Sequence, residues 1–255
     1  MKNIFDLKGR VALVTGGSSG LGVQFAKALA HQGADIAITA RRTDRLEAVK
    51  TEIEAIGVKC LTVTCDVGKT DQIVSMVAEV KKHFGKIDIL INNAGVGKAI
   101  PADTQTDDEW RWVIGINLDS VYYVAREVGK IMIEQKYGRI VNIGSLHSSV
   151  GKIGSGLSAY CASKGGLLML TKSLAYEWAP HNITVNAIGP AYFPSEMTEA
   201  AIGNDDFLES IKQRCPMGRV GRDGELDGAV VYFAAESSSY TTGQLLTVDG
   251  GWTAT

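Results

Sequence analysis

The sequence predicts a single α/β domain built on a parallel sheet of about seven strands, with helices on both faces. Short apolar runs alternate with longer amphipathic segments along the chain, a pattern typical of βαβ units. The apolar runs are nearly continuous, as expected of strands that are buried on both faces. A length of 255 residues allows one domain or two. No linker, repeat or low-complexity tract separates two parts, so we expect one domain over 1–255.

The first half of the chain is predicted to alternate between strands and helices. Residues 10–15 are rich in β-branched side chains and end in glycines, which predicts a strand, and 20–33 place apolar residues at helical spacing. By the same criteria we expect further strands at 35–40, 59–66 and 87–95, and further helices at 43–57 and 70–85.

The second half continues this alternation. A long helix is expected over 117–135, because an apolar stripe recurs there at helical spacing: Val121, Val124, Ala125, Val128, Ile131 and Met132. Further strands are expected at 139–145, 183–190 and 244–251, and further helices at 158–166 and 223–236. Residues 190–221 form the one long irregular segment, and at that length they are predicted to be a lid over a site.

Composition and charge argue against several classes of function. A net charge of −2 gives no broad attraction to nucleic acid or to an anionic membrane. No apolar segment approaches the ~20 residues that span a bilayer, and the N-terminal residues 1–10 carry charges where a signal peptide needs an apolar run. The four cysteines form no Cys-x-x-Cys pair. We therefore expect a cytoplasmic protein with buried thiols and no metal site.

A glycine-rich stretch, TGGSSGLG at 15–22, lies between the first predicted strand and the first predicted helix. Gly16 permits a tight turn, Gly20 lets the backbone approach a pyrophosphate, and Gly22 lets the helix pack closely. The helix N-terminus supplies N–H groups and a partial positive charge. The stretch predicts a dinucleotide site, although an ordinary glycine-rich turn is the alternative.

The end of the second predicted strand indicates which dinucleotide is used. Ala40 stands near the position where NAD-binding sheets carry a carboxylate, and Arg41 and Arg42 follow it. A guanidinium there suits a 2′-phosphate, and Ser18 could add a hydroxyl donor. We therefore predict that NADP(H) is preferred over NAD(H); two solvated arginines before a helix are the alternative.

The stretch SAYCASKGG at 158–166 places Tyr160 and Lys164 one helical turn apart on one face. A free tyrosine has a pKa of about 10, and a neighbouring ammonium lowers that pKa by favouring the phenolate. The spacing therefore predicts a usable acid/base at Tyr160. Ser145 ends the fifth strand, where its hydroxyl can stabilise a developing alkoxide. Taken alone, an interface tyrosine, a solvated lysine and a strand-end serine would explain these residues equally well.

Together, TGGSSGLG, NNAG at 92–95, Asn117, Ser145 and the Tyr160–Lys164 pair resemble the short-chain dehydrogenase/reductase family, in the family's order and over essentially the whole chain. The resemblance implies a doubly wound Rossmann-type fold, a nicotinamide cofactor and hydride transfer between a carbonyl and a secondary alcohol. It implies a catalytic set of Asn117, Ser145, Tyr160 and Lys164, in which Asn117 holds a water that leads to Lys164. An asparagine at a helix start is otherwise most often an N-cap.

The expected cofactor contacts combine the two motifs above with those that the resemblance adds. They are Gly16, Ser18, Ser19, Gly20, Leu21, Gly22, Arg41, Arg42, Asp66, Val67, Asn93, Ala94, Gly95, Tyr160, Lys164, Pro190 and Phe193. Substrate contacts are expected at Ser145, Tyr160 and His147, although the favoured interpretation of His147 is a surface histidine.

Two features depart from the family's pattern. Ser145 and Tyr160 stand fifteen residues apart, which predicts an enlarged loop, and Ala191 follows Pro190 where the family has glycine. Trp110 and Trp112 are expected to be packing residues. The resemblance also implies a homotetramer, built through the long helix, the Tyr160–Lys164 helix and the last strand.

The segments at 4–16, 164–178 and 191–198 look similar to the gluconate 5-dehydrogenase branch of the family, which implies 5-ketogluconate and gluconate as substrates. A 3-oxoacyl-carrier-protein reductase and a hydroxysteroid dehydrogenase are alternatives. A nucleotide-binding sensor without turnover is disfavoured by the intact Ser145, Tyr160 and Lys164.

Overall fold

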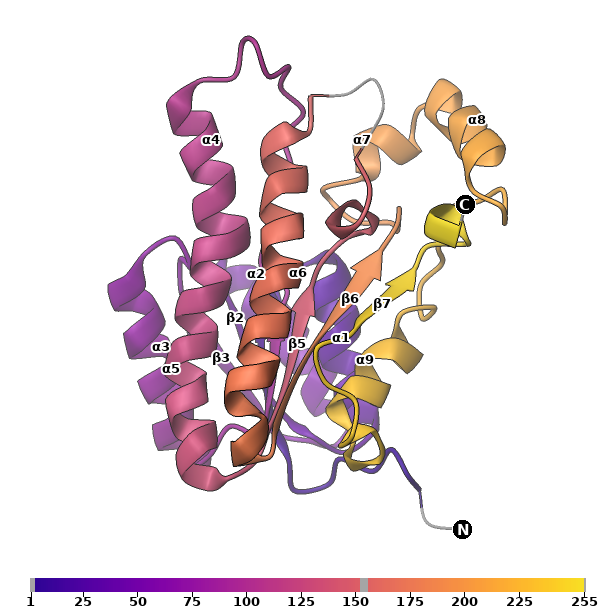
Figure 1. Ribbon diagram of the computed structural model, residues 1–255. Coiled ribbons are helices and arrows are strands. Elements are labelled where there is room, and N and C mark those ends of the chain that lie inside the picture. The colour runs from indigo at the N-terminus through magenta and orange to yellow at the C-terminus, as the bar shows by residue number, and fades with distance from the viewer. Residues whose placement is uncertain (1–2, 152–155, 255) are drawn as a thin grey trace.

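In the computed structural model, which describes residues 3–151 and 156–254, seven strands form one parallel sheet in the order β3-β2-β1-β4-β5-β6-β7 (Figure 1). Every neighbouring pair is parallel, as predicted. The chain starts in the middle of the sheet, builds outward to β3, and crosses back to continue at β4. The strands are β1 (Val11–Thr15), β2 (Asp35–Ala40), β3 (Cys60–Thr64), β4 (Ile89–Asn92), β5 (Gly138–Ile143), β6 (Ile183–Pro190) and β7 (Leu245–Val248).

Helices cover both faces of the sheet, as the apolar strands predicted. Side chains from α1 (Gly20–His31), α2 (Thr43–Glu54) and α9 (Asp227–Ala234) pack in one core. The other core is formed with α3 (Thr70–Phe84), α5 (Ser120–Gln135) and α6 (Ser158–Trp178). Among the described residues, no helix has both the length and the apolar character needed to cross a bilayer. All four cysteines are free, and Cys60, Cys65 and Cys215 are buried.

The long helix begins earlier than the sequence predicted. Helix α4 (Asp107–Ile114) runs through a π-helical turn, Gly115–Asp119, directly into α5. Thr106 caps α4 in a capping box, because its hydroxyl accepts the Glu109 N–H at 3.3 Å while its own N–H donates to the Glu109 carboxylate at 3.1 Å. Trp110 and Trp112 lie on α4 and are exposed, so the expectation that they are packing residues is wrong within this chain.

Segment 190–221 is not irregular throughout, because it contains the short helices α7 (Glu199–Ile202) and α8 (Asp205–Arg214). Asn204 caps α8 by accepting the Phe207 N–H at 3.0 Å. Both helices lie beyond the carboxyl end of β6 (Figure 1). The two ends of the segment are joined where the Gly221 N–H donates to the Tyr192 carbonyl at 2.9 Å.

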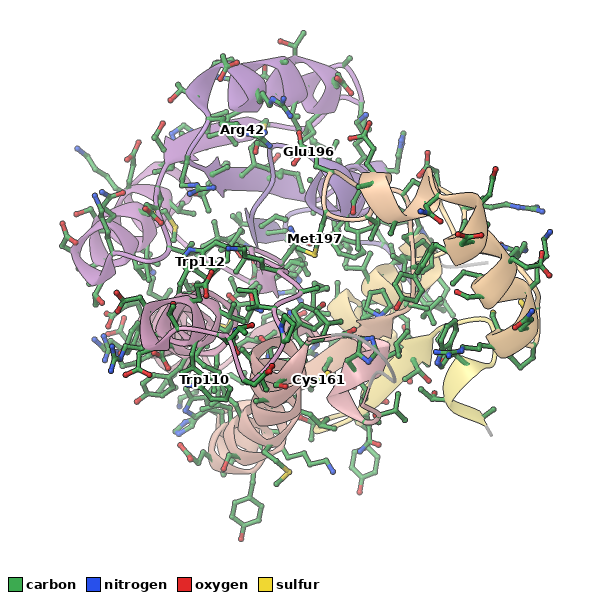
Figure 2. All side chains as sticks on the ribbon, turned by 90° about the horizontal axis from the view of Figure 1, so that it is seen from above. Arg42, Trp110, Trp112, Cys161, Glu196 and Met197 are labelled. Atoms are coloured by element: carbon green, nitrogen blue, oxygen red, sulfur yellow. The ribbon has the colours of Figure 1, made fainter. Side chains whose placement is uncertain are left out.

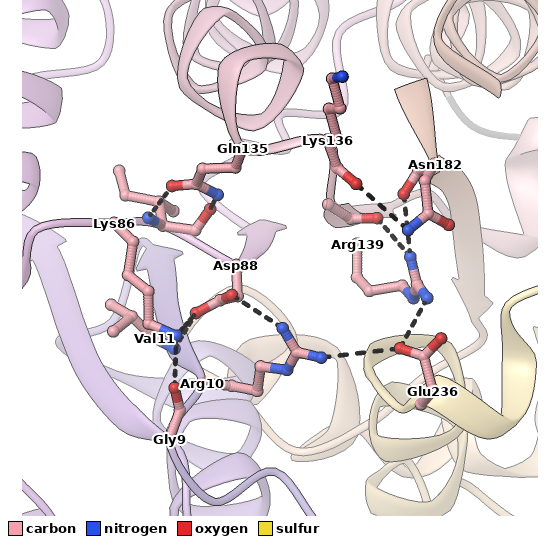
Figure 3. Close-up of polar contacts among 12 residues, drawn as sticks. Gly9, Arg10, Val11, Lys86, Asp88, Gln135, Lys136, Arg139, Asn182 and Glu236 are labelled. Carbon is pink, nitrogen blue, oxygen red and sulfur yellow. Dashed lines mark hydrogen bonds and ion pairs between the residues drawn. The ribbon is translucent and has the colours of Figure 1, made fainter. Parts of the chain in front are cut away.

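A charged cluster holds the opposite, amino edge of the sheet: Arg10, Lys86, Asp88, Arg139 and Glu236 (Figure 3). The buried Asp88 carboxylate contacts Arg10 at 3.1 Å and Lys86 at 2.9 Å. Arg139 is fully buried, and its guanidinium reaches Glu236 at 3.1 Å. The cluster connects the starts of β1, β4 and β5 to the C-terminal quarter of the chain.

Candidate active site

A cavity of about 590 Å³ lies at the carboxyl edge of the sheet. Its walls come from the ends of β1 to β6 and from part of segment 190–221. The strand order reverses between β1 and β4, and open parallel sheets bind ligands at such a position. Seen from above this edge, Arg42, Glu196 and Met197 lie around the cavity (Figure 2).

Most of the residues that the sequence singled out line this one cavity. They are Gly16, Ser18, Ser19, Gly20, Leu21, Arg41, Arg42, Asp66, Val67, Asn93, Ala94, Gly95, Ser145, His147, Tyr160, Lys164, Pro190 and Phe193. The other two, Gly22 and Asn117, are buried next to the lining residues. The structure therefore brings together positions that span most of the sequence.

The glycine-rich stretch forms a turn that only small residues permit. Gly16 has φ +68°, and a Cβ there would lie 2.8 Å from the amide nitrogen of Asn93. That amide donates to the Thr15 carbonyl at 3.0 Å, and the Thr15 hydroxyl accepts the Asn93 and Ala94 N–H groups at 3.0 and 3.1 Å. The NNAG strand end thus fixes the turn. Ser19 provides no side-chain cap to α1, which leaves the N–H groups of the first turn available to an anion.

Arg42 forms an ion pair with a carboxylate of the same chain, that of Glu196. Its guanidinium donates to the Glu196 carboxylate at 2.9 and 3.1 Å and to the Ser19 hydroxyl at 2.9 Å. The Ser18 hydroxyl lies 3.5 Å from the same guanidinium, as the prediction of a hydroxyl near the arginine requires. Arg45 also pairs with Glu196. The described groups therefore fit a phosphate at this end of the cavity.

The phenol of Tyr160 does not have the lowered pKa that the sequence predicted. Desolvation by the surrounding protein raises the pKa of Tyr160, and the nearby Ser145 hydroxyl only partly opposes this effect. The Lys164 ammonium lies 5.7 Å from the centre of the Tyr160 ring and donates to the Ile143 carbonyl at 2.7 Å. Burial is therefore the main cause of the raised pKa of Tyr160.

Lys164 is itself buried, with 5% of its surface exposed. Burial lowers the pKa of its ammonium to about 8. Most of the population is therefore protonated at neutral pH, but the charge is lost more readily than that of a surface lysine. Lys164 also lies close to the NNAG strand end, because a Cβ at Gly95 would be 3.8 Å from its Nζ.

Asn117 lies inside the π-helical turn and is not a helix N-cap. Its carbonyl oxygen accepts the Val96 N–H at 2.8 Å, and its amide donates to the Val96 carbonyl at 2.9 Å and the Ser163 hydroxyl at 3.2 Å. The Ser163 hydroxyl in turn donates to the Tyr160 carbonyl at 2.7 Å. Asn117 therefore connects the end of β4 to the helix that carries Tyr160 and Lys164.

His147 is buried, so the expectation of a surface histidine is wrong. Its ring lies edge-on to that of Tyr160 with 6.3 Å between the ring centres, and its Nδ1 is 3.0 Å from the Val150 carbonyl. The enlarged loop predicted after Ser145 includes residues 152–155, which lie outside the described residues. Beyond the sheet, Ala191 donates its N–H to the Val248 carbonyl at 3.1 Å.

Three consecutive cavity residues were not singled out from the sequence, although they lie in the predicted lid: Ser195, Glu196 and Met197. Ser195 packs near Gly20, where an added Cβ would lie 3.1 Å from the Ser195 Cβ. Met197 packs near Gly97, whose added Cβ would lie 3.2 Å from the Met197 sulfur. These residues are in a segment of mixed polarity with no local motif, so only the tertiary structure places them in the site.

Comparison with known proteins agrees with this geometry. The sequence profile of the family described as enoyl-(acyl carrier protein) reductase matches residues 16–253. A gluconate 5-dehydrogenase of Gluconobacter oxydans is 38% identical over 251 residues, which cover 98% of this chain and 97% of that protein. A 3-oxoacyl-(acyl-carrier-protein) reductase of Staphylococcus epidermidis is 37% identical over 241 residues, which cover 94% and 97%. The crystal structure of a gluconate 5-dehydrogenase from Burkholderia cenocepacia in complex with NADP and tartrate has a TM-score of 0.95 at 35% identity, covering 99% and 98%.

Proposed function

Because the chain belongs to the short-chain dehydrogenase/reductase family, we propose that it moves a hydride between NADP(H) and a ketone or secondary alcohol, with 5-ketogluconate and gluconate as its substrates. One observation carries this proposal. Ser145, Tyr160 and Lys164 line the same cavity as the glycine-rich turn and Arg42. A proton donor, an alkoxide partner and a dinucleotide site therefore meet at one place.

The residues of the cavity fit the cofactor. The turn at Gly16 and Gly20 has no room for side chains at its closest contacts, and the α1 N-terminus beside it suits a pyrophosphate. Arg42, Ser18 and Ser19 would hold the 2′-phosphate, and Asp66 and Val67 the adenine. Tyr160, Lys164, Asn93–Gly95, Pro190 and Phe193 would surround the nicotinamide half. When bound, the nicotinamide supplies the hydride.

Tyr160 is the proposed proton donor to the substrate oxygen. Its raised pKa keeps the phenol protonated at neutral pH, which is the form that ketone reduction requires. Ser145 would donate a hydrogen bond to the oxygen as negative charge develops on it. In the oxidation direction the phenol must lose its proton, and the protonated Lys164 would favour the phenolate. Asn117 positions the end of β4 and the Tyr160 helix, and its link to Lys164 through a water stays a prediction.

The proposal that 5-ketogluconate and gluconate are the substrates rests on two similar proteins and on the tartrate bound to one of them. Both are gluconate 5-dehydrogenases, and the Burkholderia protein was crystallised with tartrate, a small hydroxy acid. His147 is the proposed additional substrate contact, since it lines the cavity beside Tyr160.

The test is NADPH oxidation with a panel of ketones: 5-ketogluconate, an acetoacetyl thioester and a keto-steroid. We expect kcat/KM to be highest for 5-ketogluconate. A higher value for the thioester would assign the carrier-protein reaction instead, and a higher value for the steroid would assign a hydroxysteroid dehydrogenase. Tight NADPH binding without turnover of any ketone would identify a nucleotide sensor.

We propose that NADP(H) is preferred over NAD(H). The ion pair between Arg42 and the Glu196 carboxylate supports this proposal, because it shows that the Arg42 guanidinium can bind an anionic group at this end of the cavity. Arg42→Ala should lower kcat/KM for NADPH by roughly ten- to a hundredfold, the value of a charge-assisted hydrogen bond, because the 2′-phosphate loses its cation. The value for NADH should change little. Arg41→Ala is the comparison variant: Arg41 also lines the cavity, but its side chain makes no hydrogen bond or ion pair among the described residues, so its loss should affect NADPH less than the loss of Arg42.

We further propose that residues 1–255 form one cytoplasmic domain in which segment 190–221 is the substrate lid, and that four such chains assemble. The four free cysteines support a reducing compartment. Exposed apolar side chains on α5, α6 and β7 support the assembly: Tyr122, Met169, Tyr176 and Leu246. These are the elements through which the predicted homotetramer would form.

A further inference from the structure

Glu196 places a carboxylate of the lid among the groups that would bind the cofactor's 2′-phosphate. It accepts from Arg42 at 2.9 and 3.1 Å, from the Ser19 hydroxyl at 3.1 Å, and from Arg45. No other carboxylate contacts Arg42 among the described residues. The Glu196 carboxylate of the lid thus occupies the position in which the 2′-phosphate would bind.

We propose that Glu196 is a specificity residue that competes with the 2′-phosphate of NADP(H) for Arg42, Arg45 and Ser19, so that this phosphate, which NAD(H) lacks, releases the lid. The inference rests on the proposed function and adds a role for the lid in choosing between the two cofactors. It makes Glu196 neither a proton donor nor a contact of the reacting atoms.

A carboxylate and a phosphate cannot share this site without cost. Both are anions that require the same N–H and O–H donors, and two like charges at contact distance repel each other. Hydrogen bonds from Arg42 lower the pKa of Glu196 to about 2. The carboxylate therefore stays ionised at neutral pH, and protonation does not relieve the competition.

The neighbours of Glu196 connect this exchange to the rest of the cavity. Ser195 packs beside Gly20 of the phosphate-binding turn, and Met197 packs beside Gly97 just past the NNAG strand end. Figure 2 shows Glu196 next to Arg42, with Met197 nearer the centre of the molecule; all three line the cavity. Since the three residues are consecutive, displacement of Glu196 would also move Ser195 relative to the turn and Met197 relative to Gly97.

The first experiment measures ligand binding without turnover. Isothermal titration of the full chain with adenosine 2′,5′-bisphosphate and with AMP compares wild type, Glu196→Gln and Glu199→Gln. Glu199 is the matched control, because it is an exposed carboxylate of the same lid and its replacement changes net charge equally. We expect Glu196→Gln to bind the bisphosphate roughly two- to fivefold more tightly, the range of a partly exposed ion pair. AMP binding should be unchanged, and Glu199→Gln should behave as wild type.

The second experiment reports on the lid itself. Hydrogen exchange followed by mass spectrometry should show faster exchange of the lid peptide around 193–199 in ligand-free Glu196→Gln than in wild type. In wild type, the bisphosphate should accelerate exchange of this peptide and AMP should not.

Equal affinity of wild type and Glu196→Gln for the bisphosphate would overturn the inference, as would an equal gain for AMP or in Glu199→Gln. In that case NADPH-dependent ketone reduction by the wild type would leave the proposed function standing. A wild type that binds no bisphosphate and reduces no ketone would instead refute the proposed function, and this inference with it.

Discussion

The phenol of Tyr160 and the hydroxyl of Ser145 lie together at the carboxyl edge of the sheet, and their surroundings decide their protonation. Desolvation raises the pKa of Tyr160, so the phenol keeps its proton at neutral pH. The cation at Lys164 lies on the next turn of α6 but is hydrogen-bonded to the Ile143 carbonyl. The Tyr160–Lys164 pair, whose spacing predicts a phenolate, therefore has a protonated phenol at neutral pH.

Replacing Tyr160 by phenylalanine should remove this acid while leaving the ring in place. We expect kcat for ketone reduction to fall roughly a hundred- to ten-thousandfold, the range of general acid catalysis. NADPH affinity, measured by fluorescence titration, should stay within about threefold, since most of the expected cofactor contacts are elsewhere. Tyr176→Phe on the same helix is the control, because Tyr176 is 88% exposed and far from the cavity lining. Full activity of Tyr160→Phe would rule out the mechanism.

Lys164 should leave a signature in the pH dependence of stability. Its folded pKa of about 8 lies below the ordinary value of 10.5, so the unfolded chain binds more protons between these two pH values. The contribution of Lys164 to the free energy of unfolding therefore rises with pH over that window.

Urea unfolding of the ligand-free protein at pH 7.5 and 9.5 measures this contribution, with Lys164→Met as the reference that cannot titrate. We expect the wild type to gain about 2 kcal/mol relative to the variant between the two pH values. The comparison cancels the titration of all other groups. A difference that stays constant with pH would show that the Lys164 pKa is not lowered by burial.

Among the helices, the π-helical turn between α4 and α5 has the most direct effect on the site. It places Asn117 where the side chain satisfies both backbone groups of Val96 and contacts Ser163. π-turns occur frequently at functional sites, where they reorient a side chain that a regular helix would place elsewhere. Here the turn positions the chain just past the NNAG strand end.

Asn117→Ala should therefore lower both stability and cofactor affinity. Loss of three hydrogen bonds, with the partly buried Val96 groups left unpaired, should reduce the free energy of unfolding by about 1–3 kcal/mol, measured in urea. We also expect a raised KM for NADPH, because Gly95 and Val96 line the cavity. Ser163→Ala, which removes only one of these bonds, should have a smaller effect. A variant with wild-type stability and KM would contradict the positioning role.

At the scale of the whole molecule, the charged cluster and the cavity lie at opposite edges of the sheet. The charged cluster of Arg10, Lys86, Asp88, Arg139 and Glu236 connects distant segments at the amino edge, while the cavity and segment 190–221 occupy the carboxyl edge. Parallel strands produce this polarity, because all their carboxyl ends meet at one edge. Exposed apolar residues also lie on α5, α6 and β7, the elements through which we propose that the chains assemble.

The assembly can be tested by light scattering coupled to size-exclusion chromatography. We expect a mass near four times that of the 27.2 kDa chain. Combining Met169→Glu with Tyr176→Glu places charges on the exposed face of α6, which should dissociate that interface and lower the mass, because charge is unfavourable in a buried interface. Circular dichroism would confirm that the variant folds. A wild-type monomer at working concentration would disprove the tetramer.

Much of the architecture follows from local pattern. The strands at 35–40 and 183–190 have the predicted bounds, since apolar β-branched runs between turn residues specify strands directly. Helix α4 was missed although Thr106 and Glu109 form a recognisable capping signal, and α7 and α8 are too short for a clear periodicity. The motif residues at 15–22, 92–95 and 160–164 were found because each is a local cluster with its own chemistry.

By itself the sequence determined the order of the strands and of the helices other than α4, α7 and α8, the glycine-rich turn and the family's catalytic residue types, because each depends on neighbours within a few positions. Only the tertiary structure decided the raised pKa of Tyr160, the burial of His147 and the pairing of Arg42 with Glu196, which are 154 positions apart. Desolvation and ion pairing depend on atoms that distant segments bring into contact, and no local pattern specifies which segments those are.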